Sequence, residues 1–230
     1  MGWSDGRMGG FDVETTGEDP DQARIVAAAL VLVGADRPRH AFRLLIDPGI
    51  DIPAASTAVH GITTEQVRSE GRAPADALAE IMRLLHTTWE RDVPVVAFNG
   101  SYDFTVLDRE LGRHLDTEVS VTGPVVDPHI IDRALDRRRG KRTLEETCRH
   151  YRVKLDSAHD ATQDALAAAR LAWRLARRYP SQVGELALSE LYDKQVAWSQ
   201  QWADSLNQYW QSQGQDKTID GTWPVRPRRA

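Results

Sequence analysis

Three apolar, extended segments follow one another closely near the start of the chain, and this spacing constrains the fold more than any other feature. They run from Gly9 to Glu14, from Ile25 to Val33 and from Arg39 to Asp47, with turn residues between them. Closely spaced strands of this kind favour antiparallel pairing. The start of the chain therefore predicts an antiparallel meander of three strands.

Beyond the meander, predicted helices alternate with short apolar strands. Helical spacing of apolar residues predicts helices at 74–91, 102–114, 143–151 and 160–179. Short strands are expected at 94–98 and 125–127. The whole order predicts an α/β fold with a mixed sheet, and we assign it to a main domain of residues 1–180.

After Pro180 the pattern changes to that of a long amphipathic helix within residues 181–213. Its apolar stripe comprises Leu191, Trp198, Trp202, Leu206 and Tyr209. Such a stripe needs burial, either against the preceding domain or against another subunit, and the sequence leaves both partners open. Residues 214–230 are polar with several Pro and Arg, a composition that predicts a flexible tail.

Composition excludes several classes of protein. The 230 residues are 41% hydrophobic and 27% charged, which is typical of a globular domain with a core. A net charge of −5 argues against a protein that binds nucleic acid through its overall charge. It is compatible with a protein that binds a short piece of nucleic acid at a local site. The single Cys148 excludes an intramolecular disulfide and a thiolate zinc cluster, and we expect it to be buried. We find no secretory signal and no apolar run of membrane-spanning length, so we expect a cytoplasmic location without membrane association.

Two acids, Asp12 and Glu14, lie one residue apart in the first predicted strand and therefore share one face of it. A solvated edge strand would explain such a pair without any function. Phe11 and Val13, however, indicate an interior strand that ends in a loop. Acids at the end of a buried strand need a countercharge, and a divalent metal ion is the most compact one.

Two further acids, Asp103 and Asp164, are predicted near the starts of helices. Asp103 is expected in the first turn of a helix capped by Ser101, and favourable contact with the helix dipole would explain it equally well. Asp164 is expected one turn inside a helix capped by Asp160, just after a loop that carries His159.

Brought together, these carboxylates come from three separated segments of the chain. Four acids in one place would repel one another strongly without about two divalent cations, the arrangement used for in-line phosphoryl displacement. Mg²⁺ suits a site made of oxygen ligands alone. The residues thus predict a metal-dependent phosphoryl-transfer site.

Three motifs of this chain, in this order, resemble those of the DEDDh family of 3′–5′ exonucleases, which includes the proofreading epsilon subunit of bacterial DNA polymerase III. They are FDVETTG at 11–17, NGSYD at 99–103 and HDATQD at 159–164. The segment AVHGIT at 58–63 resembles a further conserved stretch of the family, and the likeness spans about residues 9–179. One departure is Phe98, where proofreading relatives often carry a histidine.

The resemblance implies a ribonuclease H-like fold, in which helices flank a mixed sheet, here with an added C-terminal helix. It implies two Mg²⁺ or Mn²⁺ ions bound by Asp12, Glu14, Asp103 and Asp164, and it makes His159 the general base. The positions that would contact the terminal nucleotide are Thr15, Thr16, Val59, His60 and Asn99.

The implied activity is removal of nucleoside 5′-monophosphates from the 3′ end of single-stranded DNA, in proofreading, repair or turnover. An exoribonuclease acting on RNA ends or short oligoribonucleotides stays an alternative, because the motifs hold the phosphate and are silent about the sugar. A non-catalytic nucleic-acid-binding module is the alternative from another class, and the five intact motif residues argue against it. A polymerase or a second copy of the chain would be the partner of the C-terminal helix.

Two other features have more than one interpretation. The basic run at 137–142 predicts either contacts with upstream phosphates or a solvated loop between helices, and the sequence does not separate these. Trp89 and Trp173 lie at helical spacing and are expected in the core rather than stacked on bases.

Overall fold

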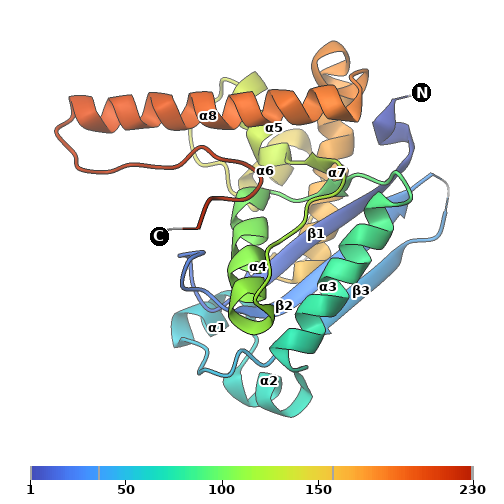
Figure 1. Cartoon of the computed structure of the whole chain (residues 1–230). Coiled ribbons are helices and arrows are strands. Elements are labelled where there is room, and N and C mark those ends of the chain that lie inside the picture. Colours follow the sequence, from blue (N-terminus) through green and yellow to red (C-terminus); the bar gives the residue numbers. More distant parts are fainter. Residues whose placement is uncertain (1, 36, 157, 229–230) are drawn as a thin grey trace.

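A computed structural model describes residues 2–35, 37–156 and 158–228 (Figure 1). Within these residues, one sheet has the strand order β3-β2-β1-β4-β5. The antiparallel part consists of β1 (Arg7–Thr15), β2 (Ile25–Gly34) and β3 (His40–Leu45), and β4 (Val95–Val96) and β5 (Val125–Val126) run parallel to β1. The predicted meander and the predicted mixed sheet are both confirmed.

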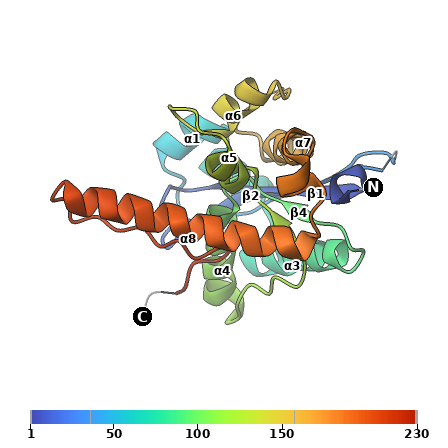
Figure 2. The ribbon, with the colours of Figure 1, turned by 90° about the horizontal axis from the view of Figure 1, so that it is seen from above.

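Helices cover both faces of the sheet. Helices α3 (Pro74–Trp89) and α4 (Gly100–Leu115) lie on one face, and α7 (Ala161–Arg178) lies on the other (Figure 2). The predicted α6 (Leu144–Tyr151) contacts α7, and the long α8 (Leu188–Ser212) follows a π-helical turn, η2 (Pro180–Gly184). A single 3₁₀ turn, η1 (Trp3–Asp5), precedes β1.

Three short helices were not predicted. They are α1 (Ala54–His60), α2 (Thr64–Glu70) and α5 (Pro128–Leu135). Helix α1 buries no residue and α2 buries only Val67, so neither displays the apolar period on which the prediction depended. Helix α5 begins with Asp127 as its N-cap and Pro128 as its first residue, a start signal that we had read as the end of a strand.

The alternation of side chains along β1 divides them between two cores. Phe11 and Val13 face the core formed with α3 and α4, where Trp89 is buried as predicted. Met8 faces the core formed with α7. Cys148 is buried in this second core, as expected, and burial raises the pKa of its thiol to about 12.

The prediction for Trp173 is wrong. The side chain is 39% exposed, and the guanidinium of Arg177 lies 4.6 Å from the centre of its ring. The alanine-rich face of α7 is the face that meets the sheet, which leaves Trp173 on the outer face. Small residues rather than the aromatic one therefore form the contact.

Helix α7 approaches the backbone of the sheet closely at Gly10. A Cβ atom on Gly10 would lie 2.0 Å from the carbonyl oxygen of Ala165, so no side chain fits there. Glycine at this position lets the helix backbone approach the strand backbone directly. Because Asp164 precedes Ala165, the contact also brings the first turn of α7 beside Asp12.

Helix α8 lies across the ends of α4 and α5, and its distal half extends beyond the rest of the fold (Figure 1). Leu191 and Trp198 of the predicted apolar stripe pack into the core of α7, whereas Tyr209 is 58% exposed. The fully buried Gln195 accepts a hydrogen bond from the Asp127 amide (2.6 Å) and donates one to the Val125 carbonyl (3.0 Å). The side chain of Gln195 thus pairs with the outer edge of β5.

The C-terminal segment differs from the flexible tail that the composition favoured. Residues 219–228 return along α8 to α4, where Trp223 is buried against Tyr192 with ring centres 5.1 Å apart. The Arg226 amide donates to the Thr105 hydroxyl (3.0 Å), and Arg228 forms an ion pair with Asp108 (2.9 Å). Only a few residues of this polar segment make these contacts. The average composition of the segment therefore did not predict that it packs against the domain.

Replacing Gly10 with alanine tests the close contact between β1 and α7. The added methyl group would force the two backbones apart, so we expect Gly10→Ala to lower the free energy of unfolding by about 1–3 kcal/mol, as overpacked cores do. Urea denaturation measures this. Gly17→Ala is the matched control, since a Cβ atom there meets nothing within 4 Å. Equal stability of Gly10→Ala and wild type would contradict the contact.

Candidate active site

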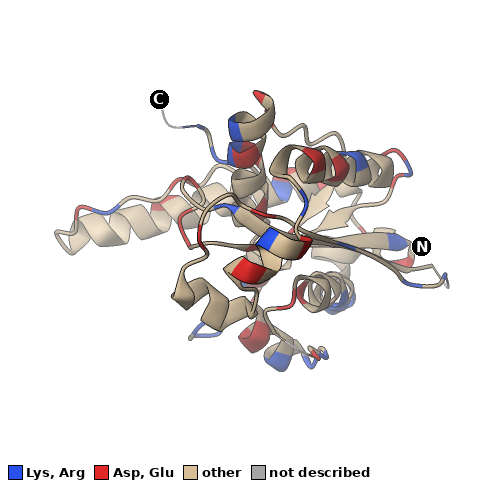
Figure 3. Cartoon of the chain, turned by 90° about the horizontal axis from the view of Figure 1, so that it is seen from below, with Lys and Arg blue, Asp and Glu red and all other residues tan. Residues whose placement is uncertain are grey.

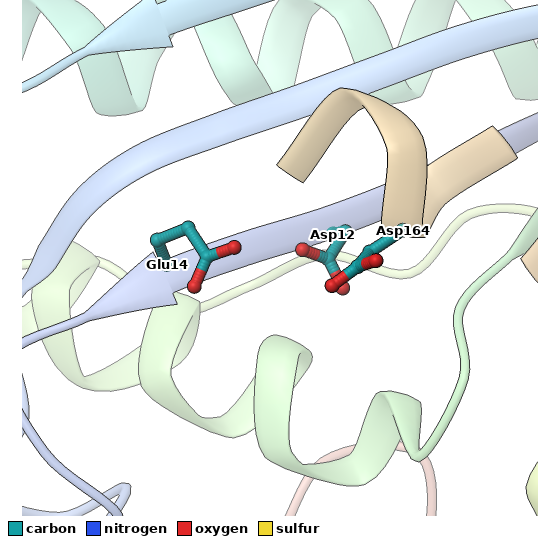
Figure 4. Close-up of side chains that lie close together, drawn as sticks. All are labelled: Asp12, Glu14 and Asp164. Atoms are coloured by element: carbon teal, nitrogen blue, oxygen red, sulfur yellow. The ribbon is translucent and has the colours of Figure 1, made fainter. Parts of the chain in front are cut away.

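Three carboxylates converge where β1 passes the start of α7. Asp12 and Glu14 project from the same face of β1, and Asp164 reaches them from the first turn of α7 (Figure 4). One oxygen from each of the three lies within 4.8 Å of the others. The structure thus brings together three of the four acids that the sequence predicts as metal ligands.

Asp164 is held by its own helix. Asp160 is the N-cap of α7, as predicted, and its carboxylate accepts hydrogen bonds from the amides of Thr162 and Gln163, each at 3.0 Å. The amide of His159 donates to Oδ2 of Asp164 (3.0 Å). The other oxygen, Oδ1, is buried without a hydrogen-bond partner among the described residues, so it is available as a ligand.

Asp103 lies close to this cluster but outside the group of three. The carboxylate is 5% exposed, and its Oδ1 accepts a hydrogen bond from the Val13 amide of β1 (3.1 Å). This bond ties the start of α4 to the strand between the two other acids. Oδ2 of Asp103 accepts no side-chain hydrogen bond among the described residues, which leaves this oxygen for a further ligand.

The start of α4 differs from the predicted one. Ser101 was expected to be the N-cap, but the helix begins at Gly100, with Asn99 in a left-handed conformation (φ 61°) as its N-cap. The side chain of Asn99 makes no capping hydrogen bond, and Asp127 supplies it instead. Its two carboxylate oxygens accept hydrogen bonds from the backbone amides of Asn99 and Gly100, each at 2.9 Å. Asp127 is a functional residue that no motif predicted, although an acid directly before Pro128 is a helix-start signal.

His159 lies on the exposed loop before α7, as predicted, with a left-handed backbone (φ 63°). Its side chain lines a cavity of about 370 Å³ together with Glu14, Arg43, Val59 and His60. This cavity therefore connects the acids to two residues that were predicted to contact the terminal nucleotide.

His60 ends the unpredicted helix α1. Its Nδ1 accepts a hydrogen bond from the Ile62 amide (3.1 Å), so the ring carries its proton on Nε2, which donates to the Thr15 carbonyl (3.3 Å). Burial lowers the pKa of this imidazole. His60 is thus a neutral donor that connects α1 to the end of β1, while neighbouring Val59 is 53% exposed in the cavity.

The remaining predicted contact residues lie in different surroundings. The hydroxyl of Thr15 lies 2.6 Å from that of Tyr102, and both bond the Gly17 carbonyl. Thr16 is buried, and its hydroxyl accepts a hydrogen bond from the backbone amide of Arg24 (2.9 Å). Asn99 lines a second cavity rather than the one that contains His60.

Part of the basic run at 137–142 forms ion pairs with a buried acid. Arg138 and Arg142 both form ion pairs with the fully buried Asp132 of α5, at 2.6 Å for Arg142. Neither predicted interpretation, phosphate contact or solvated loop, therefore holds for these two residues. Arg137, Arg139 and Lys141 are exposed.

Comparison with known proteins places this geometry in a family. Residues 10–172 match the family model of the RNase T exonucleases. The chain belongs to this exonuclease family. It is therefore a nuclease domain that hydrolyses phosphodiester bonds, with the fold expected from the resemblance.

Individual relatives agree with the assignment of this exonuclease domain. The chain is 37% identical over 153 residues to a DNA polymerase III subunit epsilon-like protein of Rhodobacter capsulatus, covering 61% of the chain and 21% of that protein. It is 25% identical over 184 residues to the PolC-type DNA polymerase III of Lacticaseibacillus paracasei, covering 80% of the chain and 12% of that protein. The chain thus spans about a fifth or less of the length of these relatives.

Solved structures show the same fold. Exonuclease I of Escherichia coli in complex with a dA16 oligonucleotide superposes with a TM-score of 0.64 at 18% identity, covering 82% of this chain and 42% of the other. Its complex with a dT13 oligonucleotide gives 0.61 at 18% identity, with coverage of 76% and 42%. In the described part of the chain, none of the helices combines the length and apolar character needed to cross a membrane.

Burial and mutual repulsion outweigh the nearby positive charges at the acids of the exonuclease site. Burial, followed by repulsion from Asp103 and Glu14, raises the pKa of Asp12 well above its ordinary value. Burial, Asp164 and Asp160 raise the pKa of Glu14 to about 7, against a small opposing effect of Arg43. Burial also raises the pKa of Asp164 to about 6.

This electrostatic situation fits divalent cations. Throughout the described chain, no Lys, Arg or His forms an ion pair with Asp12, Glu14, Asp103 or Asp164. A cluster of oxygen ligands with one unpartnered buried oxygen suits a hard ion such as Mg²⁺ or Mn²⁺. The residues present therefore fit the metal ions that the family uses.

The raised pKa values predict how stability depends on pH. Folding raises the pKa of Glu14 from 4.5 to about 7 and that of Asp164 from 3.8 to about 6. At pH values within these ranges, the folded protein therefore binds more protons than the unfolded chain. Stability of the protein in EDTA should therefore fall as pH rises through this range. Mg²⁺ should restore it, and more strongly at pH 8 than at pH 5.

Thermal unfolding across this pH range, with EDTA or Mg²⁺, measures the effect. Asp164→Asn removes one of the titrating groups, so its melting temperature in EDTA should depend less on pH than that of wild type. Asp193→Asn, on the surface of α8, is the matched control. A wild-type profile that is identical to that of Asp164→Asn would contradict the electrostatic origin.

Proposed function

We propose that this chain is a metal-dependent 3′–5′ exonuclease that releases nucleoside 5′-monophosphates from single-stranded DNA. The observation that carries the proposal is the convergence of Asp12, Glu14 and Asp164, with Asp103 close by, in a cluster that forms no ion pair with a Lys, Arg or His of the described residues. The names of the polymerase relatives and the oligonucleotides bound to exonuclease I support DNA as the substrate.

We propose Asp12, Glu14, Asp103 and Asp164 as the ligands of two Mg²⁺ or Mn²⁺ ions. Bound ions of this kind make water a better nucleophile and stabilise the leaving oxygen of the phosphodiester. Asp12 lies centrally, since both Glu14 and Asp164 are within reach of it and Asp103 raises its pKa. The hydrogen bond from the Val13 amide to Oδ1 of Asp103 would orient this carboxylate toward the other three acids.

Between the two histidines of the cavity, the hydrogen bonds favour His159 as the general base. Both ring nitrogens of His60 are bonded to the backbone, so His60 cannot accept a proton without losing the Ile62 contact. In the described chain, the ring of His159 makes no such bond, and its backbone amide fixes the loop to Asp164. His159 would accept a proton from the attacking water.

The terminal nucleotide would occupy the cavity of about 370 Å³ beside Glu14. Its volume is in the range typical of small-ligand sites. Exposed Val59 and the ring of His60 supply contact surface, and Arg43 supplies a positive charge at the same cavity. Thr15 and Thr16 would act through the shape of the backbone around the site, because hydrogen bonds within the protein hold their hydroxyls. Asn99 is held through its backbone amide, which leaves its side chain for a contact with the strand.

Polymerase association is a separate part of the proposal. The exposed Tyr209 and the projecting half of α8 would suit contact with a polymerase or a second copy of the chain, in a cytoplasmic setting. The polymerase relatives support the first partner, although the chain corresponds to only a small part of each.

Matched oligomers decide the substrate. With Mg²⁺ or Mn²⁺, we expect 5′-labelled single-stranded DNA to give a ladder that shortens from the 3′ end, and EDTA should abolish it. A higher kcat/KM on RNA of the same sequence would replace the DNA assignment with the exoribonuclease alternative. Binding of either oligomer without cleavage by the metal-loaded protein would favour the binding module instead.

Single substitutions separate the proposed roles. Asp12→Asn should abolish cleavage by removing the central ligand, with the protein still folded. His159→Gln should lower kcat about 10²–10⁴-fold, with Mg²⁺ affinity retained. His114→Gln, at the end of α4, is the matched control for a histidine. Near-normal turnover of His159→Gln would remove that residue from the role.

A further inference from the structure

A second cavity, of about 520 Å³, lies between α5, α8 and the C-terminal segment that returns along α8. Trp198, Trp202 and Arg226 line one side of it, and all three lie beyond residues 10–172 that match the family. Asn99 and Ser101, at the start of α4, line the other side. The cavity is therefore built jointly by the second motif and by the C-terminal extension.

Two arginines at this cavity form no ion pair with an acid of the described residues. The guanidinium carbon of Arg133 lies 3.8 Å from the centre of the Trp202 ring, and its Nη2 bonds Nε2 of His129 (3.1 Å). The Nε atoms of Arg133 and Arg226 are buried and, within the described residues, have no acceptor. In the same part of the chain, neither arginine forms an ion pair, so their positive charges remain available to an anion.

Within the described residues, the acids near Arg133 attract its charge without forming an ion pair with it. Burial, followed by the nearby Arg133, lowers the pKa of His129 to about 3, so His129 is neutral. Both oxygens of Asp127 accept backbone amides. Asp220 directs one oxygen to the Thr222 amide (2.7 Å). The stacked guanidinium of Arg133 is thus held in place by aromatic and neutral contacts rather than by a carboxylate.

The position of the cavity relates it to the exonuclease site. Asp12 and Glu14 lie near the carboxyl end of β1, Asn99 follows β4, and Asp127 follows β5. These three strands are parallel, so all of these residues lie at the same edge of the sheet. A chain molecule with its end at the acids can therefore pass Asn99 and reach the space beside α5.

Charge is otherwise mixed over the protein. In the view from below, Lys and Arg alternate with Asp and Glu, and the ribbon of α8 carries few charges of either sign (Figure 3). With a net charge of −5, the protein has to hold a polyanion at local sites rather than across a broad basic face. The two arginines beside α5 and α8 form such a local site.

We propose that this cavity binds a phosphate group of the nucleic-acid strand, upstream of the phosphodiester at the metal site, through Arg133 and Arg226. The inference rests on the proposed nuclease function and assigns part of its strand-binding path to the C-terminal extension. The same phosphate chemistry occurs in a free nucleoside monophosphate, which is the competing occupant.

Binding of labelled oligomers of different length tests the proposal independently of cleavage. Fluorescence anisotropy would follow oligothymidylates and oligouridylates of two and twelve residues in Ca²⁺, with gels to check that they stay intact. Arg226→Gln is the first variant, because the Arg226 contacts with Thr105 and Arg109 are made by backbone atoms. Arg133→Gln is the second, and Arg83→Gln, an exposed arginine of α3, is the matched control.

For the twelve-residue oligomers, we expect both cavity variants to raise Kd about tenfold or more, while Arg83→Gln matches wild type. The slope of log affinity against log salt should fall by about 0.7, which corresponds to one lost phosphate contact. The two-residue oligomers are too short to reach the cavity, so the ratio of variant to wild-type Kd should be close to one.

Several results would overturn the proposal. One is an unchanged Kd and salt slope for the long oligomers in Arg226→Gln, which also decides the matter if Arg133→Gln fails to fold. Another is an equal loss of affinity for short and long oligomers, which would place the effect at the terminal site. A third is loss of thymidine monophosphate binding with strand binding intact. Failure of the proposed nuclease function would instead show as absent cleavage by wild type, whatever these affinities are.

Discussion

The contact between Gly10 and the backbone of Ala165 determines where the acids of this protein meet. Because β1 has no side chain at this point, α7 packs directly on the strand with an alanine-rich face. The first turn of the helix then lies beside Asp12 and Glu14, at a separation that lets oxygens from three carboxylates share one small volume. A larger residue at the crossing would widen that volume and separate the ligands.

The protein treats its buried acids in two different ways. Asp132 is fully buried, and Arg138, Arg142 and the hydroxyl of Tyr151 all bond it. The cluster around Asp12 has no such partners among the described residues, and burial followed by repulsion between the acids raises the pKa values of Asp12 and Glu14. The difference distinguishes a structural acid, neutralised by the fold, from acids whose charge is left for ions that the fold does not contain.

Sequence patterns predicted the features that depend on local period or on motif order. The two-residue period placed Asp12 and Glu14 on one face, and the cap at Asp160 correctly positioned Asp164. Such patterns did not predict the left-handed conformation of Asn99 or its hydrogen bond to Asp127. This bond joins segments that are distant in sequence. The short helices around His60 were missed for another reason, because they bury almost no side chains and so carry no apolar period.

Gln195 has a consequence for where this domain ends. The family match stops at residue 172, yet the side chain of Gln195, more than twenty residues later, satisfies the outer amide and carbonyl of β5. Without α8, β5 would be an open edge strand with unpaired backbone groups, a template for pairing with other chains. Helix α8 thus covers an edge of the sheet that would otherwise invite pairing with other chains, although it lies beyond the residues that match the family model.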